Sequence, residues 1–453
     1  MPLARHCANG PPGTAPSKPQ VTSLLQKITS DQIDDETGNM PLARHCANGP
    51  PGTAPSKPQV TSLLQKITSD RLISGHLKDE ITHMTLGCRL SVSGLKFKSK
   101  WVIFMYRHGD RAPITLYPND PHNATIWPNG LGQLTKRGKA MQYALGRWLR
   151  NRYKNFISEK WIPEEVYVRS TDVDRTLMSA ACNLAALYYP EKPARFEDDV
   201  AWLPTPIHTA PLSEDLLLSV DQSCPRIQKE LVRQEELPVV KNVTEESQVL
   251  FQFLTEKSGQ NVTTILDVDY LYDTLRIEAL YNLTLPDWTH DVLPAMKELS
   301  DFSFEIVALS EELKRLRAGP IIGEMGKNMR EKVAGKTPQQ KMFMYSAHDT
   351  TLAQLLLGLG VFNNVAPPYA TTFIIELHKH NENEHYVKMF LRNDTKIIDP
   401  PYELHLPGCP DPCTLDDWLS ITSQVVPEDW AAECKSDDDV VEMATETLVG
   451  EFV

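Results

Sequence analysis

The stretch "VIFMYRHGDRAPI", residues 102–114, joins five apolar residues directly to a cluster of charged ones. A short continuous apolar run is typical of a strand that is buried on both faces in a parallel sheet. In open α/β sheets, ligands bind beyond the carboxyl ends of such strands. The stretch therefore predicts an α/β fold and a candidate site at Arg107, His108 and Arg111.

Two further segments end in the same way. The residues "VYVRS" at 166–170 predict a second strand, and apolar residues at helical spacing from Val173 to Leu187 predict a helix after it. The residues "KMFMYSAHDTTLAQLLLGLG" at 341–360 repeat the order of strand, turn and helix. Because parallel strands end at one edge of a sheet, the charged residues of the three junctions can meet there.

An imidazole flanked by guanidinium groups suits phosphoryl transfer. His108 can act as a covalent nucleophile, and Arg107 and Arg111 can hold phosphate oxygens in bidentate contacts. Gly109 allows the backbone to turn closely. The plain alternative is a basic surface turn, but a strand that ends in Arg-His-Gly-x-Arg favours a functional site.

The other two junctions supply further candidates, each with an ordinary structural alternative. Arg175 falls in the opening turn of its helix, where it can bind an anion or pair with Asp172 or Asp174. His348 can donate to phosphate oxygens. Asp349 can cap the helix that follows it, or it can give a proton to a leaving alkoxide.

Composition limits the kind of partner. The chain has 453 residues and a formal net charge of −13, which argues against a nucleic-acid-binding surface. No run approaches the roughly 18 consecutive apolar residues of a membrane span, so none is predicted.

Sequons and cysteines indicate the compartment. Cys409 and Cys413 form a CxxxC pair in a proline-rich loop, and no Cys and His group has the spacing of a zinc site. N-x-S/T sequons can arise by chance, yet together with cysteines suited to disulfides they favour an oxidising, glycosylating compartment. The sequons lie at Asn123, Asn242, Asn261, Asn282 and Asn393.

The chain begins with a duplication. Residues 1–31 recur unchanged as residues 40–70, and both copies are rich in Pro, Gly and Ser in their first half. We expect residues 1–95 to form a poorly ordered leader, without a structural role for Cys7 and Cys46. No secretory signal peptide is visible, and the duplication is either real or a gene-model error.

The remaining chain divides into three parts. Helical patterns broken by prolines predict a mostly helical insertion at about 205–335 within a catalytic domain of residues 96–435. Residues 371–380 and 384–393 predict a hairpin. Residues 436–453 form an acidic tail.

From about residue 97 to 435 the chain resembles the histidine acid phosphatase family, in its prostatic, lysosomal and testicular group. The motifs that carry the resemblance occur in family order: "RHGDRAPI", "YPNDP", "VYVRSTDVDRTLMSA", "IHTAPLSED", "MYSAHDTT", "PPYA" and "LPGCPDPC". Several long motifs in register are more specific than the short RHG that phosphoglycerate mutases also carry.

The resemblance implies a fold and a mechanism. The fold is a mostly parallel central sheet flanked by helices, like that of phosphoglycerate mutase, with a smaller helical domain. The activity is hydrolysis of phosphate monoesters at acid pH through a phosphohistidine on His108, with Asp349 protonating the leaving group. The implied phosphate ligands are Arg107, Arg111, Arg175 and His348.

The resemblance also implies disulfides, substrates and a location. The expected bridges join Cys224 to Cys434 and Cys409 to Cys413, and Cys182 is left as a buried free thiol. Substrates are expected to be small phosphomonoesters or phosphoproteins, without a cofactor or a metal. A homodimer and a location in the lysosomal lumen or outside the cell are implied as well.

Rival interpretations exist for both site and function. His378, His380 and His385 lie close together in sequence, but a solvated hairpin tip is favoured over a metal site. A phosphotransferase shares the histidine and the arginines and differs in the phosphoryl acceptor. A phytase-like enzyme should carry extra basic residues, and a catalytically silent secreted binding protein is disfavoured by the intact constellation.

Overall fold

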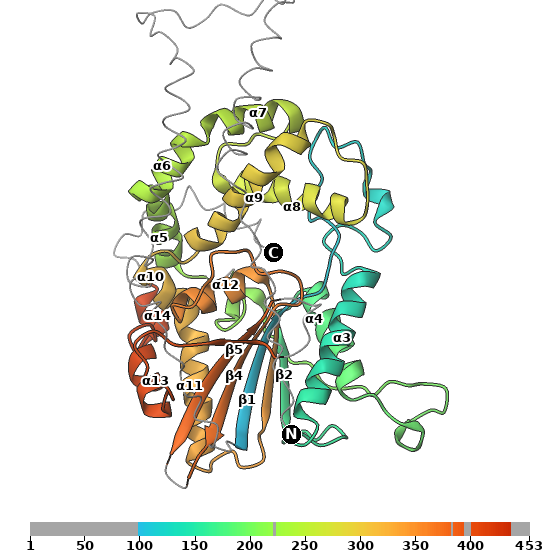
Figure 1. Ribbon diagram of the computed structural model, residues 1–453, viewed down its shortest axis with the longest axis vertical. Coiled ribbons are helices and arrows are strands. Elements are labelled where there is room, and N and C mark those ends of the chain that lie inside the picture. The colour runs from blue at the N-terminus through green and yellow to red at the C-terminus, as the bar shows by residue number, and fades with distance from the viewer. Residues whose placement is uncertain (1–97, 221–222, 382–383, 394–399, 436–453) are drawn as a thin grey trace, which may run out of the picture. The chain divides into compact units, whose positions relative to one another are not determined.

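The computed structural model describes four stretches of the chain, residues 98–220, 223–381, 384–393 and 400–435 (Figure 1). Predictions for the leader at residues 1–95 and for the acidic tail at residues 436–453 lie outside the described residues. The same holds for Cys7, Cys46 and Cys88.

The described residues belong to two compact units. Of one unit, only Pro286–Ala295 are described, and they include the start of helix α9. The other unit contains the remaining described residues, including α9 from Met296 onward, and both cavities described below lie within it.

Six strands form one sheet in the order β2-β3-β1-β4-β5-β6 (Figure 1). The strands are β1 Lys98–Arg107, β2 Val166–Ser170, β3 Met342–Ala347, β4 Thr372–Lys379, β5 His385–Arg392 and β6 Tyr402–Leu404.

The three strands predicted to carry the candidate residues are adjacent and parallel. Strand β3 pairs with β1 on one side and with β2 on the other. At their carboxyl ends Arg107 lies opposite Ala347, and Ser170 lies opposite Ser346. The loops that follow these strands therefore leave the sheet at one edge.

The sheet is mixed, which corrects the expectation of a mostly parallel one. Among the described strands, β1 pairs antiparallel with β4, β4 with β5, and β5 with β6. The predicted hairpin of β4 and β5 is present, and it extends the sheet beyond β1. Since adjacent hairpin strands run in opposite directions, this half of the sheet is antiparallel.

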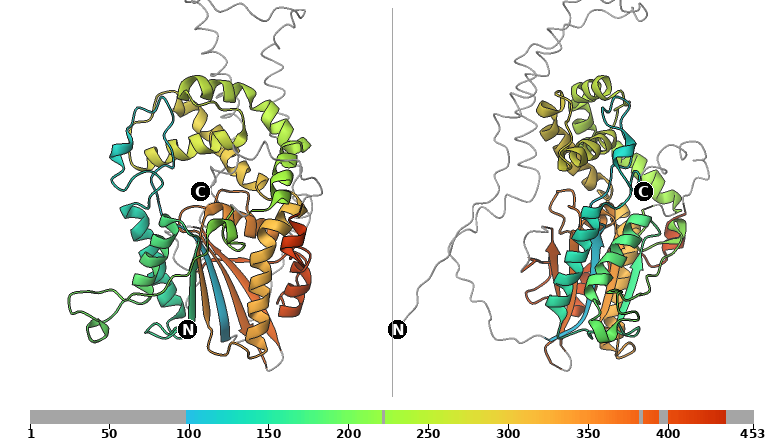
Figure 2. Two further views of the ribbon diagram at one scale, coloured as in Figure 1. Left: turned by 180° about the vertical axis from the view of Figure 1, so that it is seen from behind. Right: turned by 90° about the vertical axis from the view of Figure 1, so that its right-hand side faces the viewer.

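Strand β1 is buried on both faces, as its sequence predicts. Trp101, Ile103 and Met105 belong to a core cluster with residues of α11 (Gly319–Val333), α12 (Asp349–Gly358) and α13 (Leu415–Thr422). Val102, Phe104 and Tyr106 alternate with them and belong to a second cluster with residues of α3 and α4. Each such side chain contributes roughly 1.5–3 kcal/mol on burial. The result is a sheet covered by helices on both faces (Figure 2).

The helices that cover the sheet begin and end at residues with clear local causes. Helix α3, Lys136–Tyr153, is capped by the Thr135 side chain, which accepts a hydrogen bond from the Gly138 amide. Helix α12, Asp349–Gly358, is followed by Gly360 in the left-handed region at φ +68°.

Several helices occupy the predicted insertion, and three of them start with a proline in the first turn, where a missing amide costs nothing. They are α5 Pro225–Glu235, α6 Pro238–Glu246, α7 Gln248–Ser258, α8 Ile265–Leu280, α9 Thr289–Ile306, α10 Glu311–Leu313, the π-helical turn η5 Lys314–Ala318 and α11 Gly319–Val333. The insertion also contains the short turn η4 Leu212–Glu214. The remaining helices are η2 Ala124–Ile126, α4 Asp174–Leu187, η3 Lys192–Ala194, α13 Leu415–Thr422 and α14 Trp430–Glu433.

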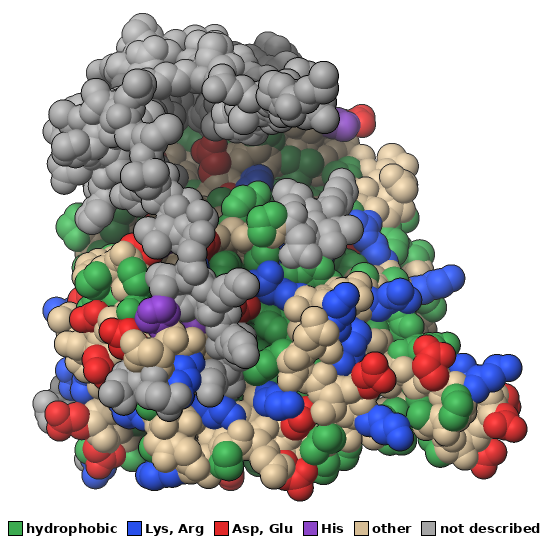
Figure 3. Space-filling model, turned by 60° about the horizontal axis from the view of Figure 1, so that its bottom comes forward, with side chains coloured by type: hydrophobic (Ala, Val, Ile, Leu, Met, Phe, Trp, Pro, Cys, Tyr) green, Lys and Arg blue, Asp and Glu red, His purple; other side chains and the backbone are tan. Residues whose placement is uncertain are grey.

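The surface shown in Figure 3 carries basic and acidic side chains near one another, which is the mixed pattern of a solvated face. Within the described ranges, no helix has both the length and the apolar composition that crossing a bilayer requires.

Candidate active site

The candidate residues converge where β1, β2 and β3 end. Arg107 closes β1 and His108 follows it, while His348 and Asp349 follow β3. Arg175 lies in the first turn of α4, just after β2. Side chains from segments more than 200 residues apart in sequence thus meet at one edge of the sheet, as the sequence predicts.

Gly109 allows the loop after β1 to lie against helix α3. A Cβ atom on Gly109 would come within 2.3 Å of the Gly138 carbonyl oxygen, so no larger residue fits without a backbone shift. The Gly109 amide donates to the Ser179 hydroxyl at 3.1 Å, which ties the loop to α4 as well. His108 is therefore held on a loop anchored on two sides.

Hydrogen bonds define the protonation of the His108 ring. Nδ1 lies 2.7 Å from the Gly109 carbonyl oxygen, which can only accept, so Nδ1 carries the proton. Nε2 lies 3.3 Å from Nε of Arg175, which donates to it. Nε2 is therefore unprotonated, and its lone pair becomes free when the Arg175 donor turns to another acceptor.

The surroundings of His108 keep its ring neutral. Burial first, and then the charges of Arg175 and Arg107, hold the pKa of His108 well below its usual value. A neutral imidazole has a free lone pair, whereas a protonated one does not. The cations that keep the His108 ring neutral would also attract an anion to it.

Arg107 is fixed from several directions. It is 3% exposed, and its Nη1 donates to the Pro367 carbonyl oxygen at 2.5 Å. Its Nη2 forms an ion pair with Asp349 Oδ2 at 2.6 Å. The guanidinium carbon lies 4.2 Å from the centre of the Tyr369 ring, a cation–π contact. Little side-chain entropy remains to be lost when Arg107 binds a ligand.

Arg175 links the two histidines. Its Nη2 lies 3.4 Å from Nδ1 of His348, whose Nε2 lies 3.0 Å from the Thr171 hydroxyl. Burial and Arg111 lower the pKa of Arg175 to about 10, and it still carries a charge at acid and neutral pH. The structure shows no ion pair of Arg175 with Asp172 or Asp174, so that alternative is wrong.

Asp349 does not act as the helix cap that the sequence allowed. Helix α12 begins at Asp349 itself, and the carboxylate accepts from the Thr350 amide at 2.9 Å. Burial raises the pKa of Asp349, but Arg107 and Arg111 outweigh burial and leave it below its usual value. The free enzyme therefore holds Asp349 as a carboxylate paired with Arg107.

Helix α8 supplies a second set of charged residues. Asp273 accepts from Arg111 Nη1 at 2.7 Å and from Arg276 Nη2 at 2.9 Å. Although burial opposes it, the attraction of these two arginines lowers the pKa of Asp273. Arg276 also lies over the Tyr369 ring, at 5.2 Å from its centre. Asp273 thus positions Arg111 from the helical side of the site.

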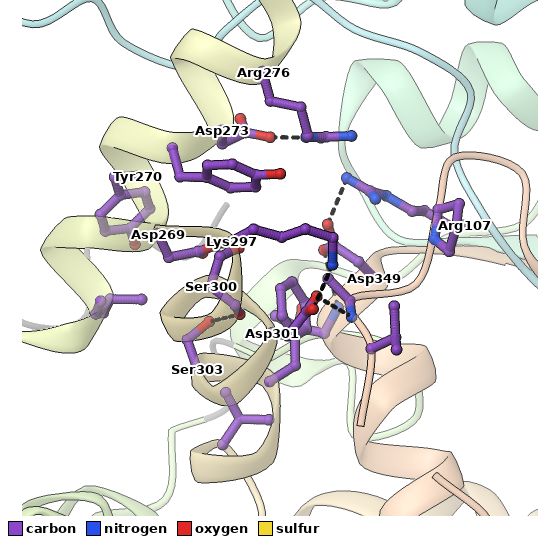
Figure 4. Close-up of a pocket in the computed structure, with 18 of the residues that line it drawn as sticks. Arg107, Asp269, Tyr270, Asp273, Arg276, Lys297, Ser300, Asp301, Ser303 and Asp349 are labelled. Atoms are coloured by element: carbon purple, nitrogen blue, oxygen red, sulfur yellow. Dashed lines mark hydrogen bonds and ion pairs between the residues drawn. The ribbon is translucent and has the colours of Figure 1, made fainter. Parts of the chain in front are cut away.

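These residues open into a cavity of about 250 Å³ between the sheet edge and helices α8 and α9 (Figure 4). Arg107 and Asp349 enter it from the sheet, and Asp273 and Arg276 enter it from α8. Further lining residues are Asp269, Tyr270, Lys297, Ser300, Asp301 and Phe304. A charged base and a partly apolar wall are typical of a small-molecule site.

Comparison with known proteins identifies the family. A model of the histidine phosphatase superfamily (branch 2) matches residues 98–392. The chain belongs to this superfamily. The resemblance found in the sequence is therefore confirmed.

Named relatives are acid phosphatases. The chain is 40% identical over 356 residues to the lysosomal acid phosphatase of Xenopus laevis, covering 78% of this chain and 82% of the relative. It is 40% identical over 367 residues to the prostatic acid phosphatase of Rattus norvegicus, and the match covers 78% of this chain and 94% of that relative. These relatives confirm the prediction of an enzyme of the acid phosphatase class.

Solved structures confirm the histidine phosphatase fold. The Hafnia alvei phytase in complex with tartrate aligns with a TM-score of 0.56 at 17% identity, covering 75% of this chain and 99% of the phytase. The Klebsiella sp. ASR1 phytase aligns with a TM-score of 0.55 at 16% identity, and the alignment covers 76% of this chain and 98% of the phytase.

The structure of this family member adds residues that sequence reasoning missed. Asp273 and Arg276 lie three residues apart on α8, and this spacing alone predicts only an ordinary surface ion pair. Tyr369 belongs to the "PPYA" motif, and the place of this motif in the family order is the signal that could have found it. Asp273 contacts Arg111 and Tyr369 contacts Arg107, which are both predicted phosphate ligands, whereas Arg276 contacts Asp273 and Tyr369.

The disulfides implied by the resemblance are present. Cys224 is bonded to Cys434 and Cys409 to Cys413. Cys182 is free and half-buried, so it is less enclosed than expected.

One histidine of the hairpin differs from its prediction. His378 is buried on β4 and its Nε2 lies 2.8 Å from a Glu376 oxygen, so the expectation of a solvated side chain is wrong there. The period-two alternation of the strand places it beside Glu376 on the same face. Within the described residues, no group of three or more His, Cys, Asp or Glu side chains could hold a metal ion.

Proposed function

We propose that the protein hydrolyses phosphate monoesters at acid pH through a phosphohistidine on His108. One observation carries the proposal: the Nε2 lone pair of a buried neutral His108 lies beside three buried arginines. Fixed positive charge around a nucleophile favours attack on a phosphate group. The negative charge of the transition state is stabilised there without any rearrangement of the surrounding side chains. The phosphate ligands are Arg107, Arg111, Arg175 and His348.

In the first step His108 Nε2 attacks phosphorus and the P–O bond to the leaving group breaks. The ring then carries the phosphoryl group on Nε2 and its proton on Nδ1, where the Gly109 carbonyl oxygen accepts it. The arginines supply the positive charge that metal ions supply in other phosphatases. No cofactor is required for this step.

Asp349 must gain a proton before it can give one to the leaving oxygen. In the free enzyme Arg107 pairs with it and lowers its pKa. A bound phosphate takes the Arg107 donors and places negative charge next to the carboxylate, and both effects raise the pKa of Asp349. Substrate binding at acid pH therefore creates the acid that the reaction needs.

In the second step the Asp349 carboxylate accepts a proton from water, and the water oxygen attacks the phosphohistidine. The N–P bond breaks, His108 recovers its lone pair, and inorganic phosphate leaves. The same group thus serves as acid and then as base. This order favours a hydrolase over a phosphotransferase, because the residue that activates water is already in place.

The cavity favours substrates with a single phosphate over inositol polyphosphates. Its helical side carries Asp269, Asp273 and Asp301, and the cations there are paired: Arg276 with Asp273 and Lys297 with Asp301 at 2.5 Å. A second phosphate group would meet carboxylates rather than free cations. Small phosphomonoesters and exposed phosphorylated side chains of proteins remain as substrates.

We further propose that the chain is a glycoprotein of the lysosomal lumen or the extracellular space. The two disulfides require an oxidising compartment to form. The side chains of four sequon residues are exposed: Asn123, Asn242, Asn261 and Asn282. Asn393 is half-buried, and we expect it to be modified least. The homodimer stays a prediction of the resemblance.

The reaction type is tested by product analysis in ¹⁸O-labelled water at pH 5. We expect each released phosphate to carry one ¹⁸O atom, with monophosphates turned over faster than phytate. Unlabelled phosphate, or transfer to an added alcohol in place of water, would contradict hydrolysis. Faster release from phytate than from any monophosphate would contradict the proposed substrate class.

A further inference from the structure

A second cavity lies outside the candidate active site and shares no lining residue with it. Its volume is about 750 Å³, within the range of ligand pockets. The cavity lies between the start of helix α3, the loop around η2 and the end of helix α8. Its lining residues include Trp127, Lys136, Arg137, Lys139 and Tyr281.

The charge of this cavity is opposite to that of the chain. Lys136, Arg137 and Lys139 line it, and no Asp or Glu is among the lining residues. No described residue forms an ion pair with any of the three cations, in a chain of net charge −13. In the catalytic cavity, by contrast, the cations Arg276 and Lys297 are paired. Unpaired cations around a hollow favour a bound anion.

The amide groups at the start of helix α3 add to the attraction. Thr135 caps the helix by accepting from Gly138, which leaves the first two amides of this 18-residue helix without an intrahelical acceptor. The positive end of the helix dipole lies at the same end of α3 as the three cations, so both attract an anion there.

Aromatic rings form another wall. Trp127 and Tyr281 contact each other edge to face, with ring centres 5.0 Å apart. Trp127 is 6% exposed, and its indole N–H has no acceptor among the described residues. A buried donor without a partner is unfavourable, so a small shift of the ring that brought this N–H to an acceptor on a ligand would be stabilising. The rings suit a planar apolar group.

The cavity is built on the same residues that hold the catalytic loop. The hydroxyl groups of Thr135 and Tyr281 each donate to Asp110 Oδ2 at 2.5 Å. Asp110 lies two residues after His108 and is fully buried. A ligand in the cavity would therefore touch two side chains that position the loop of the nucleophile.

We propose that this cavity is an accessory site for a small aromatic anion, with the phosphate or sulfate group at Lys136, Arg137 and Lys139 and the ring against Trp127 and Tyr281. The proposal does not rest on the phosphohistidine mechanism, because binding at this cavity requires no turnover.

Calorimetric titration with 1-naphthylphosphonate at pH 5 tests the proposal, since a phosphatase does not cleave its P–C bond. We expect two binding events in the wild-type protein, one at each cavity. The triple variant Lys136→Gln, Arg137→Gln, Lys139→Gln should keep only the event at the arginines around His108. A matched triple variant, Lys154→Gln, Lys160→Gln, Lys192→Gln, removes the same charge from exposed positions elsewhere and should keep both.

A single event in the wild-type protein, or two unchanged events in the triple variant, would overturn the proposal. If the triple variant loses both events, the single variant Arg137→Gln decides the matter. We expect it to weaken the second event about tenfold and leave the first unchanged. Equal affinity of Arg137→Gln and the wild-type protein for the second event would refute the accessory site.

Discussion

The two walls of the catalytic cavity differ in how their charges are used. The wall at the sheet edge presents Arg107 from the end of β1 and Asp349 from the start of α12, and Arg107 is followed directly by His108. The opposite wall presents Asp273 and other residues from helices α8 and α9 (Figure 4). At the sheet wall the arginines surround a neutral histidine, and Arg175 has no carboxylate partner among the described residues, although Arg107 pairs with Asp349 and Arg111 with Asp273. On the helix wall Arg276 and Lys297 each pair with a carboxylate.

The two walls are therefore expected to have different roles, one in the chemical step and the other in the choice of substrate. Arg175 has no carboxylate partner among the described residues, so it can stabilise the charge of a phosphate under attack without first breaking an ion pair. Cations that are already paired gain little from a second phosphate, because an existing ion pair must first be broken. The sheet wall is therefore expected to control the rate constant of the chemical step, and the helix wall to control which substrates enter.

Replacing the nucleophile should give the largest effect. We expect His108→Ala to lower kcat on the order of 10⁴-fold or more, because the covalent intermediate forms on the ring that this change removes. Steady-state phosphate release at pH 5 measures the loss. His122→Ala, a half-buried histidine away from the site, serves as control, and an equal loss in both variants would count against His108 as nucleophile.

Removing the proton donor should give the next largest effect. We expect Asp349→Asn to lower kcat for alkyl phosphates roughly 10²- to 10³-fold. Aryl phosphates should lose less, since their leaving groups need less protonation. The ratio of kcat for alkyl and aryl substrates measures the difference. Equal losses for both would remove Asp349 from the acid role.

The sheet wall could be predicted from sequence for a physical reason. Apolar runs mark buried strands, and polar residues that end such runs must lie at the sheet edge. Arg107, His108, Arg175 and Asp349 were found in this way. The sequence could not show that β4 pairs beside β1 in the opposite direction, because strand order depends on contacts between distant segments.

The helix wall could not be predicted from sequence for an equally physical reason. Asp273 and Arg276 have the spacing of a common surface ion pair, and only the packing of α8 over the sheet edge places them near Arg111. Tyr369 lies in a loop without periodicity. The sequence also allowed Asp349 as a helix cap, and only the ion pair with Arg107 shows that its side chain faces the cavity.

Freeing one cation on the helix wall should change selectivity. Asp301 pairs with Lys297 at 2.5 Å, so Asp301→Asn leaves Lys297 available for a second phosphate. We expect kcat/KM for fructose 1,6-bisphosphate, relative to fructose 6-phosphate, to rise roughly fivefold. The double variant Lys297→Gln, Asp301→Asn should return to the wild-type ratio. A ratio that does not change in Asp301→Asn would show that this wall does not select.

The free energy of unfolding should depend on pH through His348, which lies at the sheet edge. Burial and Arg175 lower the pKa of His348 to about 3, so the folded protein stays neutral there while the unfolded chain binds a proton below pH 6.5. This contribution to stability is present above pH 6.5 and is lost as the pH falls. Its loss should reach roughly 2–3 kcal/mol by about pH 4.5.

Urea unfolding of the wild-type protein and of His348→Gln measures this contribution. The free energy of unfolding should fall less steeply between pH 7 and pH 4.5 in the variant than in the wild-type protein. Parallel pH profiles would show that His348 is not held neutral in the folded state.

Direct trapping of the phosphoenzyme tests the central claim that His108 Nε2 attacks phosphorus. Enzyme mixed with a ³²P-labelled monoester at pH 5 is quenched within milliseconds into alkali, where phosphohistidine survives, and the labelled peptide is sequenced. We predict that the label lies on His108 and that it is absent in His108→Ala. Label on another residue, or a burst of released alcohol without any labelled protein, would contradict the account.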